Sequence, residues 1–113
     1  MKNRIVTSPL FDKRYKRFKK KFPSLEKELL EFLILIDENP KVGILITDNV
    51  YKIRLASADK NSGKSGGFRI ITYVVDEIAG STFEIILLII YDKSEESSFD
   101  KNEIKNIIKQ LGL

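Results

Sequence analysis

Residues 83–91 read FEIILLIIY, and Glu84 is the only charged side chain among them. Residues 68–75 read FRIITYVV and are nearly all apolar as well. Each stretch has the length of one strand, and a strand that is apolar on both faces lies in the centre of a sheet. We therefore predict two central strands, joined by a turn at residues 76–82.

A further strand is predicted at residues 51–55, where apolar residues alternate with Lys52 and Arg54. A period of two places both cations on one polar face of the strand. Residues 59–67, DKNSGKSGG, form the loop that leads to the next strand. This loop is not a P-loop, because Ala58 stands where that motif requires its first glycine.

The segment before these strands predicts one short strand and two helices. The β-branched residues within 4–8 are typical of a strand. Aromatic residues recur every three or four positions from Phe11 to Phe22, which is the spacing of one helical face, and Pro23 ends that helix. A second, apolar helix follows, and we expect Ser24 to be its N-cap.

A closing helix is predicted after Asp100, which can form a capping box with Glu103, and Gly112 is expected to be its C-terminal cap. The predicted helices are segregated from a run of consecutive strands, which is typical of the α+β class. We expect one domain over residues 1–113. In it, an N-terminal strand and a helical hairpin pack on an antiparallel sheet of about four strands, closed by a short C-terminal helix.

The composition excludes several kinds of chemistry. The 113 residues include no Cys and no His, so there is no thiol nucleophile, disulfide, Cys-ligated metal or histidine acid–base group. Glu95 and Glu96 do not complete a metal site, and we expect neither a metal nor another cofactor. There is no apolar stretch of about 18 residues and no signal peptide, so we expect a cytoplasmic protein without a membrane partner.

The net charge of +4 is distributed in blocks. Residues 1–22 and 49–75 are basic, whereas residues 23–48 and 76–113 are acidic. If folding brings the basic blocks together, they form a face that favours a polyanion such as nucleic acid. A solvated surface that only alternates in sign is the alternative interpretation.

Three cations form a candidate binding group around the Gly-rich loop. Lys52 and Arg54 share one strand face, and Arg69 begins the next strand, so the three can converge in an antiparallel pair. Phe68 stands next to them and could stack on a base. Ordinary surface cations are again the alternative.

Taken in order, these segments resemble the RelE/ParE toxin superfamily, and above all the HigB-like branch of the RelE toxins. The resemblance covers nearly the whole chain. It is carried by YKIRLA at residues 51–56, by GKSGG at 63–67, by FRIITY at 68–73 and by LIIYDKSE at 88–95.

The resemblance implies a RelE-like fold and the toxin of a type II toxin–antitoxin pair. Such a toxin enters the ribosomal A site and cuts mRNA by attack of the 2′-hydroxyl, without a metal, and a cognate antitoxin protein covers its basic groove. By position, Lys52 corresponds to the general base and Arg54 to a phosphate partner. Arg69 corresponds to the ligand of the scissile phosphate, and Lys93 to a further basic group. The residues expected to contact RNA are Lys60, Lys64, Phe68 and Tyr91, together with Lys16, Lys19 and Lys20 of the first helix.

The sequence departs from RelE at one position, where a tyrosine near the last helix is replaced by Phe99. Phenylalanine cannot donate a proton, so Tyr91, Lys93 or water must protonate the leaving group. Two alternatives therefore stay open. One is a ParE-like inhibitor of gyrase, and the other is an RNA-binding protein on the same fold that does not cleave.

Overall fold

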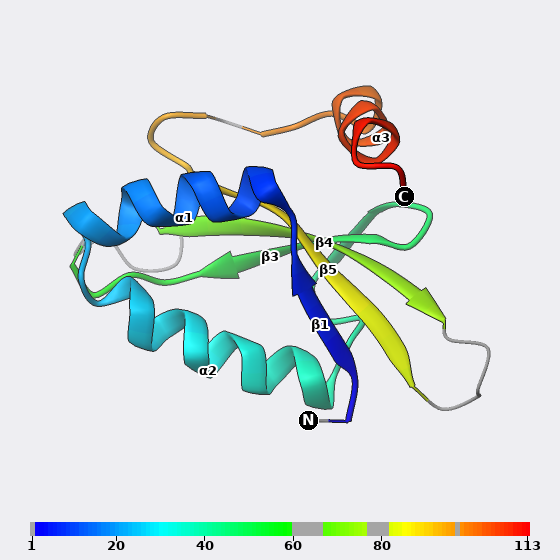
Figure 1. The fold of residues 1–113 in the computed structure, drawn as a ribbon. Helices are drawn as coiled ribbons and strands as arrows, with labels where there is room; N and C mark the ends of the chain where they lie inside the picture. Colours follow the sequence, from blue (N-terminus) through cyan, green and yellow to red (C-terminus); the bar gives the residue numbers. More distant parts are fainter. Residues whose placement is uncertain (1, 60–66, 77–81, 97) are drawn as a thin grey trace.

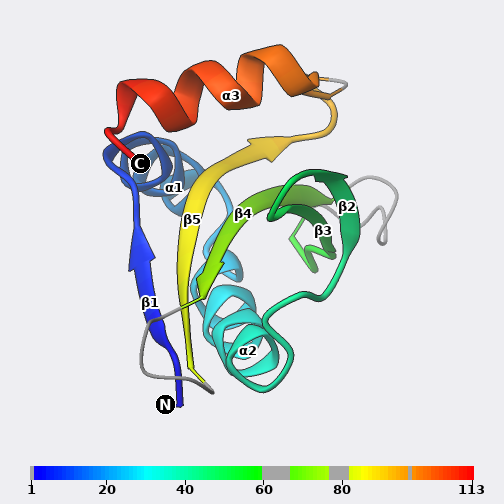
Figure 2. The ribbon, with the colours of Figure 1, turned by 90° about the vertical axis from the view of Figure 1, so that its right-hand side faces the viewer.

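The computed structural model describes residues 2–59, 67–76, 82–96 and 98–113. It has an α+β architecture in which three helices pack on a five-stranded mixed sheet (Figures 1 and 2). Within the described ranges, none of the helices is long and apolar enough to cross a membrane. The elements are β1 (Arg4–Thr7), α1 (Pro9–Lys21), α2 (Leu25–Glu38), β2 (Ile44–Thr47), β3 (Val50–Leu55), β4 (Phe68–Asp76), β5 (Phe83–Asp92) and α3 (Lys101–Gln110).

The strands lie in the order β1-β5-β4-β3-β2. The two stretches that the sequence places in the centre, β4 and β5, are adjacent and antiparallel, which confirms that prediction. The expectation of a purely antiparallel sheet is wrong for β1, which pairs with β5 in parallel, Arg4 opposite Glu84. Whether β1 runs parallel or antiparallel to β5 depends on the path of the chain between the two strands. The four residues of β1 contain no information about that path.

The strand β2 is an addition that the sequence did not predict, so the sheet has five strands and not about four. It is an edge strand that pairs only with the first half of β3. Ile44 and Leu45 are consecutive, yet their exposed fractions are 57% and 60%. Ile46 and Thr47 are both half-buried, so burial does not alternate along β2, and the strand lacks the alternation by which strands are recognised in a sequence.

Helix α1 begins at the Ser8-Pro9 pair. The Ser8 hydroxyl accepts a hydrogen bond from the Phe11 backbone N–H at 3.0 Å, and it donates one to the Leu88 carbonyl at 2.7 Å. Proline is well suited to the first helical position, because its fixed φ is helical and its missing N–H has no partner there. Ser8 therefore both caps α1 and ties it to β5.

Helix α2 begins where the sequence predicts, but Ser24 does not cap it. Its backbone is helical, with φ −64° and ψ −16°, and its hydroxyl makes no capping bond. The Ser24 hydroxyl instead accepts a hydrogen bond from the Asp59 N–H at 3.3 Å and donates one to the Glu28 carboxylate at 3.3 Å. The start of α2 is thereby attached to the chain that follows β3.

The end of α2 is attached to the N-terminal strand. The Asp37 carboxylate accepts hydrogen bonds from the backbone N–H groups of Lys2 and Asn3 at 3.0 and 2.9 Å. The Asn3 side chain in turn donates to the Asp37 carbonyl at 2.7 Å and accepts from the Phe83 N–H at 2.9 Å. Helix α2, β1 and the start of β5 therefore meet at one cluster.

Both faces of the sheet are buried, as the apolar central strands predict. Phe18 and Phe32 of the helical hairpin form one cluster with Ile70 and Leu87 of the sheet. We call this side the hairpin face. Ile104 of α3 belongs to the cluster on the opposite side of the sheet, which we call the α3 face. Figure 2 shows α3 lying on the opposite side of the sheet from α2. The predicted capping box of α3, formed by Asp100 and Glu103, is present, and Gly112 follows the helix with φ +74°.

Candidate functional site

Three polar side chains form a row across the centre of the sheet. Arg54 of β3 is the register partner of Arg69 of β4, and Arg69 is the register partner of Tyr91 of β5. Residues that are directly opposite on neighbouring strands point to the same face, with their Cβ atoms about 5 Å apart. Tyr91 lies in the cluster on the α3 face, so the whole row belongs to that face. We call these three residues the Arg54 row.

Lys52 extends the row along β3. It precedes Arg54 by two residues and therefore lies on the same face, about 7 Å away along the strand. Its register partner on β4 is Ile71, and it is half-buried, whereas Arg54 is exposed. The convergence of Lys52, Arg54 and Arg69 that the sequence predicts is thus present in the sheet.

Arg69 is a buried cation, with an exposed fraction of 3%. One of its guanidinium nitrogens, Nη1, donates to the Phe68 carbonyl at 3.2 Å. Burial lowers the pKa of Arg69, and the charge of Arg54 lowers it further. A guanidinium stays protonated even so, because its ordinary pKa is so high. Two positive charges therefore stand side by side here, and they favour an anion at this end of the sheet.

Tyr91 is fully buried. Its ring packs edge-on against Phe99, with ring centroids 5.0 Å apart. Burial raises the pKa of the Tyr91 hydroxyl, and the charge of Arg69 opposes that shift only in part. The hydroxyl therefore keeps its proton at neutral pH and is available as a hydrogen-bond donor.

The chain that follows β5 turns at the end of the row. The Asp92 carboxylate accepts hydrogen bonds from the Ser94 N–H at 2.9 Å and from the Ser94 hydroxyl at 2.8 Å, which fixes this turn. Lys93 is exposed, and its backbone N–H lies 3.4 Å from the Gly67 carbonyl. This contact places the Lys93 backbone at the same end of the sheet as Arg69 and Tyr91.

Two arginines of α1 form ion pairs with the segment that follows β5, and the sequence patterns identify neither of them. Arg14 forms an ion pair with Glu96, and its guanidinium carbon lies 5.8 Å from the centroid of the Phe99 ring. Arg17 contacts both carboxylate oxygens of Glu95 at 3.2 Å. The only signal in the sequence is the opposite charge of two segments about eighty residues apart, which does not identify pairs.

The α1 lysines that were predicted to contact RNA do not join the Arg54 row. Lys16, Lys19 and Lys20 are exposed on α1, whose buried side packs on the hairpin face. Lys19 also lies 3.5 Å from the Glu26 carboxylate, which partly neutralises it.

The predicted stacking of Phe68 on a base is wrong for this structure. Phe68 is fully buried among the rings of Phe18 and Phe22, whose centroids lie 5.0 and 5.5 Å from its own. Adjacent residues of a strand point to opposite faces, so Arg69 faces α3 while Phe68 fills the hairpin face. Complete burial also closes Tyr91 to direct contact with RNA in this conformation. The predicted contacts of Lys60 and Lys64 lie outside the described residues.

Among the described residues, no three carboxylates are grouped in a way that could hold a metal ion. A scan of the chain against protein-family models finds no match. The candidate functional site is therefore inferred from the geometry of the Arg54 row, in which two guanidinium groups lie beside one buried phenol.

Proposed function

We propose that this chain is a RelE-like toxin of a type II toxin–antitoxin system, which cuts mRNA in the ribosomal A site. The observation that carries the proposal is the Arg54 row, which sets two guanidinium groups and a phenol side by side on three strands. Phosphodiester cleavage concentrates negative charge on the phosphate, and preorganised cations lower the free energy of that transition state. The lysines on either side of the row, Lys52 and Lys93, supply candidate proton-transfer groups.

In the proposed reaction, Lys52 acts as the general base and takes the proton of a ribose 2′-hydroxyl. The 2′-oxygen then bonds to the adjacent phosphorus, and the bond from phosphorus to the 5′-oxygen breaks. Arg54 and Arg69 balance the negative charge of the crowded phosphate. Lys93 returns a proton to the departing 5′-oxygen. The products are a 2′,3′-cyclic phosphate and a free 5′-hydroxyl, and this route needs no cofactor.

The proposed partners follow from this activity. The substrate is mRNA on the ribosome, which places the protein in the cytoplasm. The exposed cations of α1 are suited to ribosomal RNA, because binding to a phosphate backbone depends on positive charge. A cognate antitoxin protein would have to cover the cationic face to keep the toxin inactive.

The burial of two members of the row favours a second candidate function. Arg69 is 3% exposed and Tyr91 is fully buried, so neither reaches a phosphate unless the chain around them moves. If it does not move, Lys52 and Arg54 form a binding surface, and the protein binds RNA without cleaving it.

Primer extension on a reporter mRNA after brief induction in cells separates these functions. Cuts within translated codons should appear with the unmodified chain and disappear when the start codon is removed. Both Arg69→Ala and Arg54→Ala should abolish the cuts, and the exposed Arg54 carries little risk of misfolding. Lys101→Ala on α3 is the matched control and should cut normally. Intact mRNA in cells that still stop growing would refute the nuclease and favour a binding target.

A further inference from the structure

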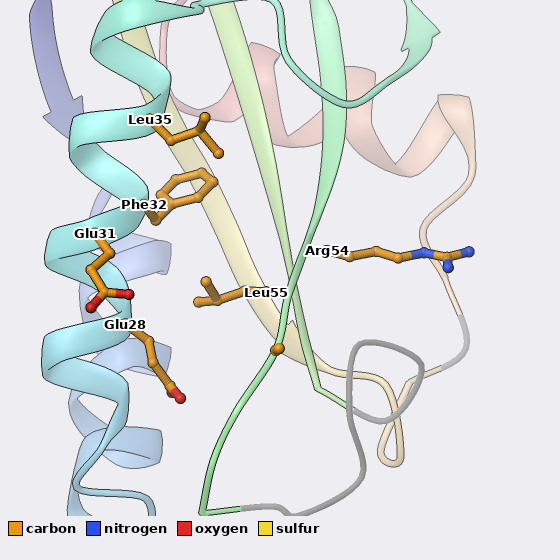
Figure 3. Close-up of a pocket in the computed structure, with 7 residues that line it drawn as sticks. Glu28, Glu31, Phe32, Leu35, Arg54 and Leu55 are labelled. Carbon is orange, nitrogen blue, oxygen red and sulfur yellow. The ribbon is translucent and has the colours of Figure 1, made fainter.

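A shallow groove lies on the hairpin face, between α2 and the end of β3 (Figure 3). Its volume is about 240 Å³. Phe32 and Leu35 point into it from α2, and Leu55 points into it from β3. The Arg54 side chain extends away from α2, to the other face of the sheet. Arg54 nevertheless belongs to the lining of the groove, so the groove adjoins the Arg54 row at β3, while the Arg54 side chain points to the other face.

The backbone beside this groove is an open strand edge. Strand β2 pairs with β3 only as far as Lys52, and within the described part of the chain no other strand continues that pairing toward Leu55. A strand with an open edge can accept another extended chain, since its outward N–H and C=O groups have no strand partner.

Two glycines show which backbone groups point outward. A Cβ atom on Gly67 would lie 2.2 Å from the Leu55 carbonyl oxygen, so that carbonyl points toward β4. A Cβ atom on Gly43 would lie 2.5 Å from the Lys52 carbonyl oxygen, so that carbonyl points toward the β2 side. Backbone groups alternate in direction along a strand. The N–H and C=O groups of Arg54 therefore point to the open edge.

The outer surface of α2 is apolar and acidic. Leu30, Ile34 and Leu35 have exposed fractions of 58%, 57% and 45%. Residues 25–38 carry five carboxylates against one lysine, on a chain whose net charge is +4. Glu28 and Glu31 stand at the groove itself. This charge repels RNA, and it complements a protein segment that carries both apolar and basic side chains.

We propose that an extended segment of a partner protein adds to the open edge of β3 in this groove. Its backbone pairs with the outward groups of Arg54. Its groove-facing positions alternate with solvent-facing ones, and they carry apolar side chains against Phe32 and Leu35 and a Lys or Arg against Glu31. This proposal does not depend on the proposed nuclease activity, because it concerns the edge backbone of β3 and the α2 side of the sheet, and not the side chains of the Arg54 row.

The test uses synthetic peptides of about ten residues, the length of a long strand. The probe peptide carries Leu, Lys and Leu at successive alternate positions, with Thr between them, and its binding is followed by fluorescence anisotropy and by amide chemical shifts. A second peptide replaces Lys with Glu. Two further peptides are N-methylated on alternate amides, one on the odd positions and the other on the even positions. Each of them therefore lacks one of the two sets of backbone donors.

We expect the Lys peptide to bind and to shift the amides of Leu35 and Leu55, whereas the Glu peptide should not bind. One of the two N-methylated peptides should lose binding and the other should keep it. Glu31→Lys and Leu35→Ser should each weaken binding about tenfold. Glu38→Lys makes the same charge change on the same helix outside the groove, and it should leave binding unchanged.

Three results would overturn the proposal. The first is equal binding of the Lys and Glu peptides, or no binding of either. The second is equal binding of both N-methylated peptides, which would exclude strand pairing. The third is a dimeric mass of the free protein that Leu35→Ser reduces to a monomer, because a second copy would then be the occupant.

Discussion

Arg54 and Arg69 face each other across neighbouring strands, and the charge of Arg54 lowers the pKa of Arg69. Like charges that are directly opposite in a sheet destabilise it, by a few tenths of a kcal/mol up to about 1 kcal/mol. The burial of Arg69 adds the cost of removing a charge from water. A pair that is unfavourable for folding is typical of a site that serves binding or catalysis.

The first prediction concerns this repulsion. Arg54→Gln should raise the free energy of unfolding by about 0.5 kcal/mol, because it removes one of two opposed charges. Under the proposed function, the same change should also lower mRNA cleavage about 100-fold, because Arg54 is the proposed phosphate ligand. Urea denaturation and primer extension measure the two effects. Lys105→Gln on α3 is the control, and a less stable Arg54→Gln variant that cleaves normally would contradict the prediction.

The second prediction concerns the basic surface of α1. Lys16→Gln combined with Lys20→Gln should weaken binding to ribosomes and reduce the dependence of the binding constant on salt. The slope of log K against log salt concentration should fall by about 0.7 for each lost contact with single-stranded RNA. A matched pair on α3, Lys101→Gln with Lys105→Gln, should leave the slope unchanged. Equal slopes for both double variants would show that α1 does not contact RNA.

The third prediction compares the two ion pairs between α1 and the segment after β5. The Arg14 and Glu96 side chains are 23% and 33% exposed, whereas those of Arg17 and Glu95 are 57% and 45% exposed. Glu96→Gln should therefore lower the free energy of unfolding by about 1 kcal/mol, and Glu95→Gln by less than about 0.5 kcal/mol. Equilibrium denaturation at low and high salt measures both, and equal losses would refute the difference.

The fourth prediction concerns pH. The backbone N–H groups of Asn3 and then of Lys2 lower the pKa of Asp37 below its ordinary value of 3.8. A carboxylate whose folded pKa is depressed contributes stability above its unfolded pKa, and this contribution is lost as the pH falls through the folded value. Asp37→Asn should therefore be less stable than the unmodified chain near neutral pH.

That difference should shrink as the pH falls from 3.8, the ordinary pKa, through the lower pKa of Asp37 in the folded chain, where its carboxylate becomes protonated. Denaturation over a pH series measures it. Glu38→Gln changes the neighbouring exposed carboxylate and should show no such convergence. A stability difference for Asp37→Asn that stays constant across the series would show that the charge of Asp37 is not the cause.

The sequence predicts well the features that depend on residues close together in the chain. The apolar runs of β4 and β5, the alternation in β3 and the capping box of α3 are all present. Each depends on a short repeat or on a hydrogen bond between residues three apart, so a local window contains all the necessary information.

Ser24 and Phe68 show where local patterns fail. Ser24 has the right residue type for a cap, yet contacts with Asp59 and Glu28 take its hydroxyl. Phe68 directly follows a polar loop in the sequence, yet strand alternation turns it into the core, where it packs against Phe18 and Phe22. In both cases a contact with a distant segment outweighs the local preference.

The α+β class, the apolar centre of the sheet and the position of three cations around a Gly-rich loop all follow from local patterns in the sequence. Three features appear only in the folded chain: β1 runs parallel to β5, β2 pairs with only the first half of β3, and Tyr91 lies in one row with Arg54 and Arg69. The reason is that strand direction and register join segments distant in the chain. The free energy that fixes them comes from packing the whole core, which no single segment contains.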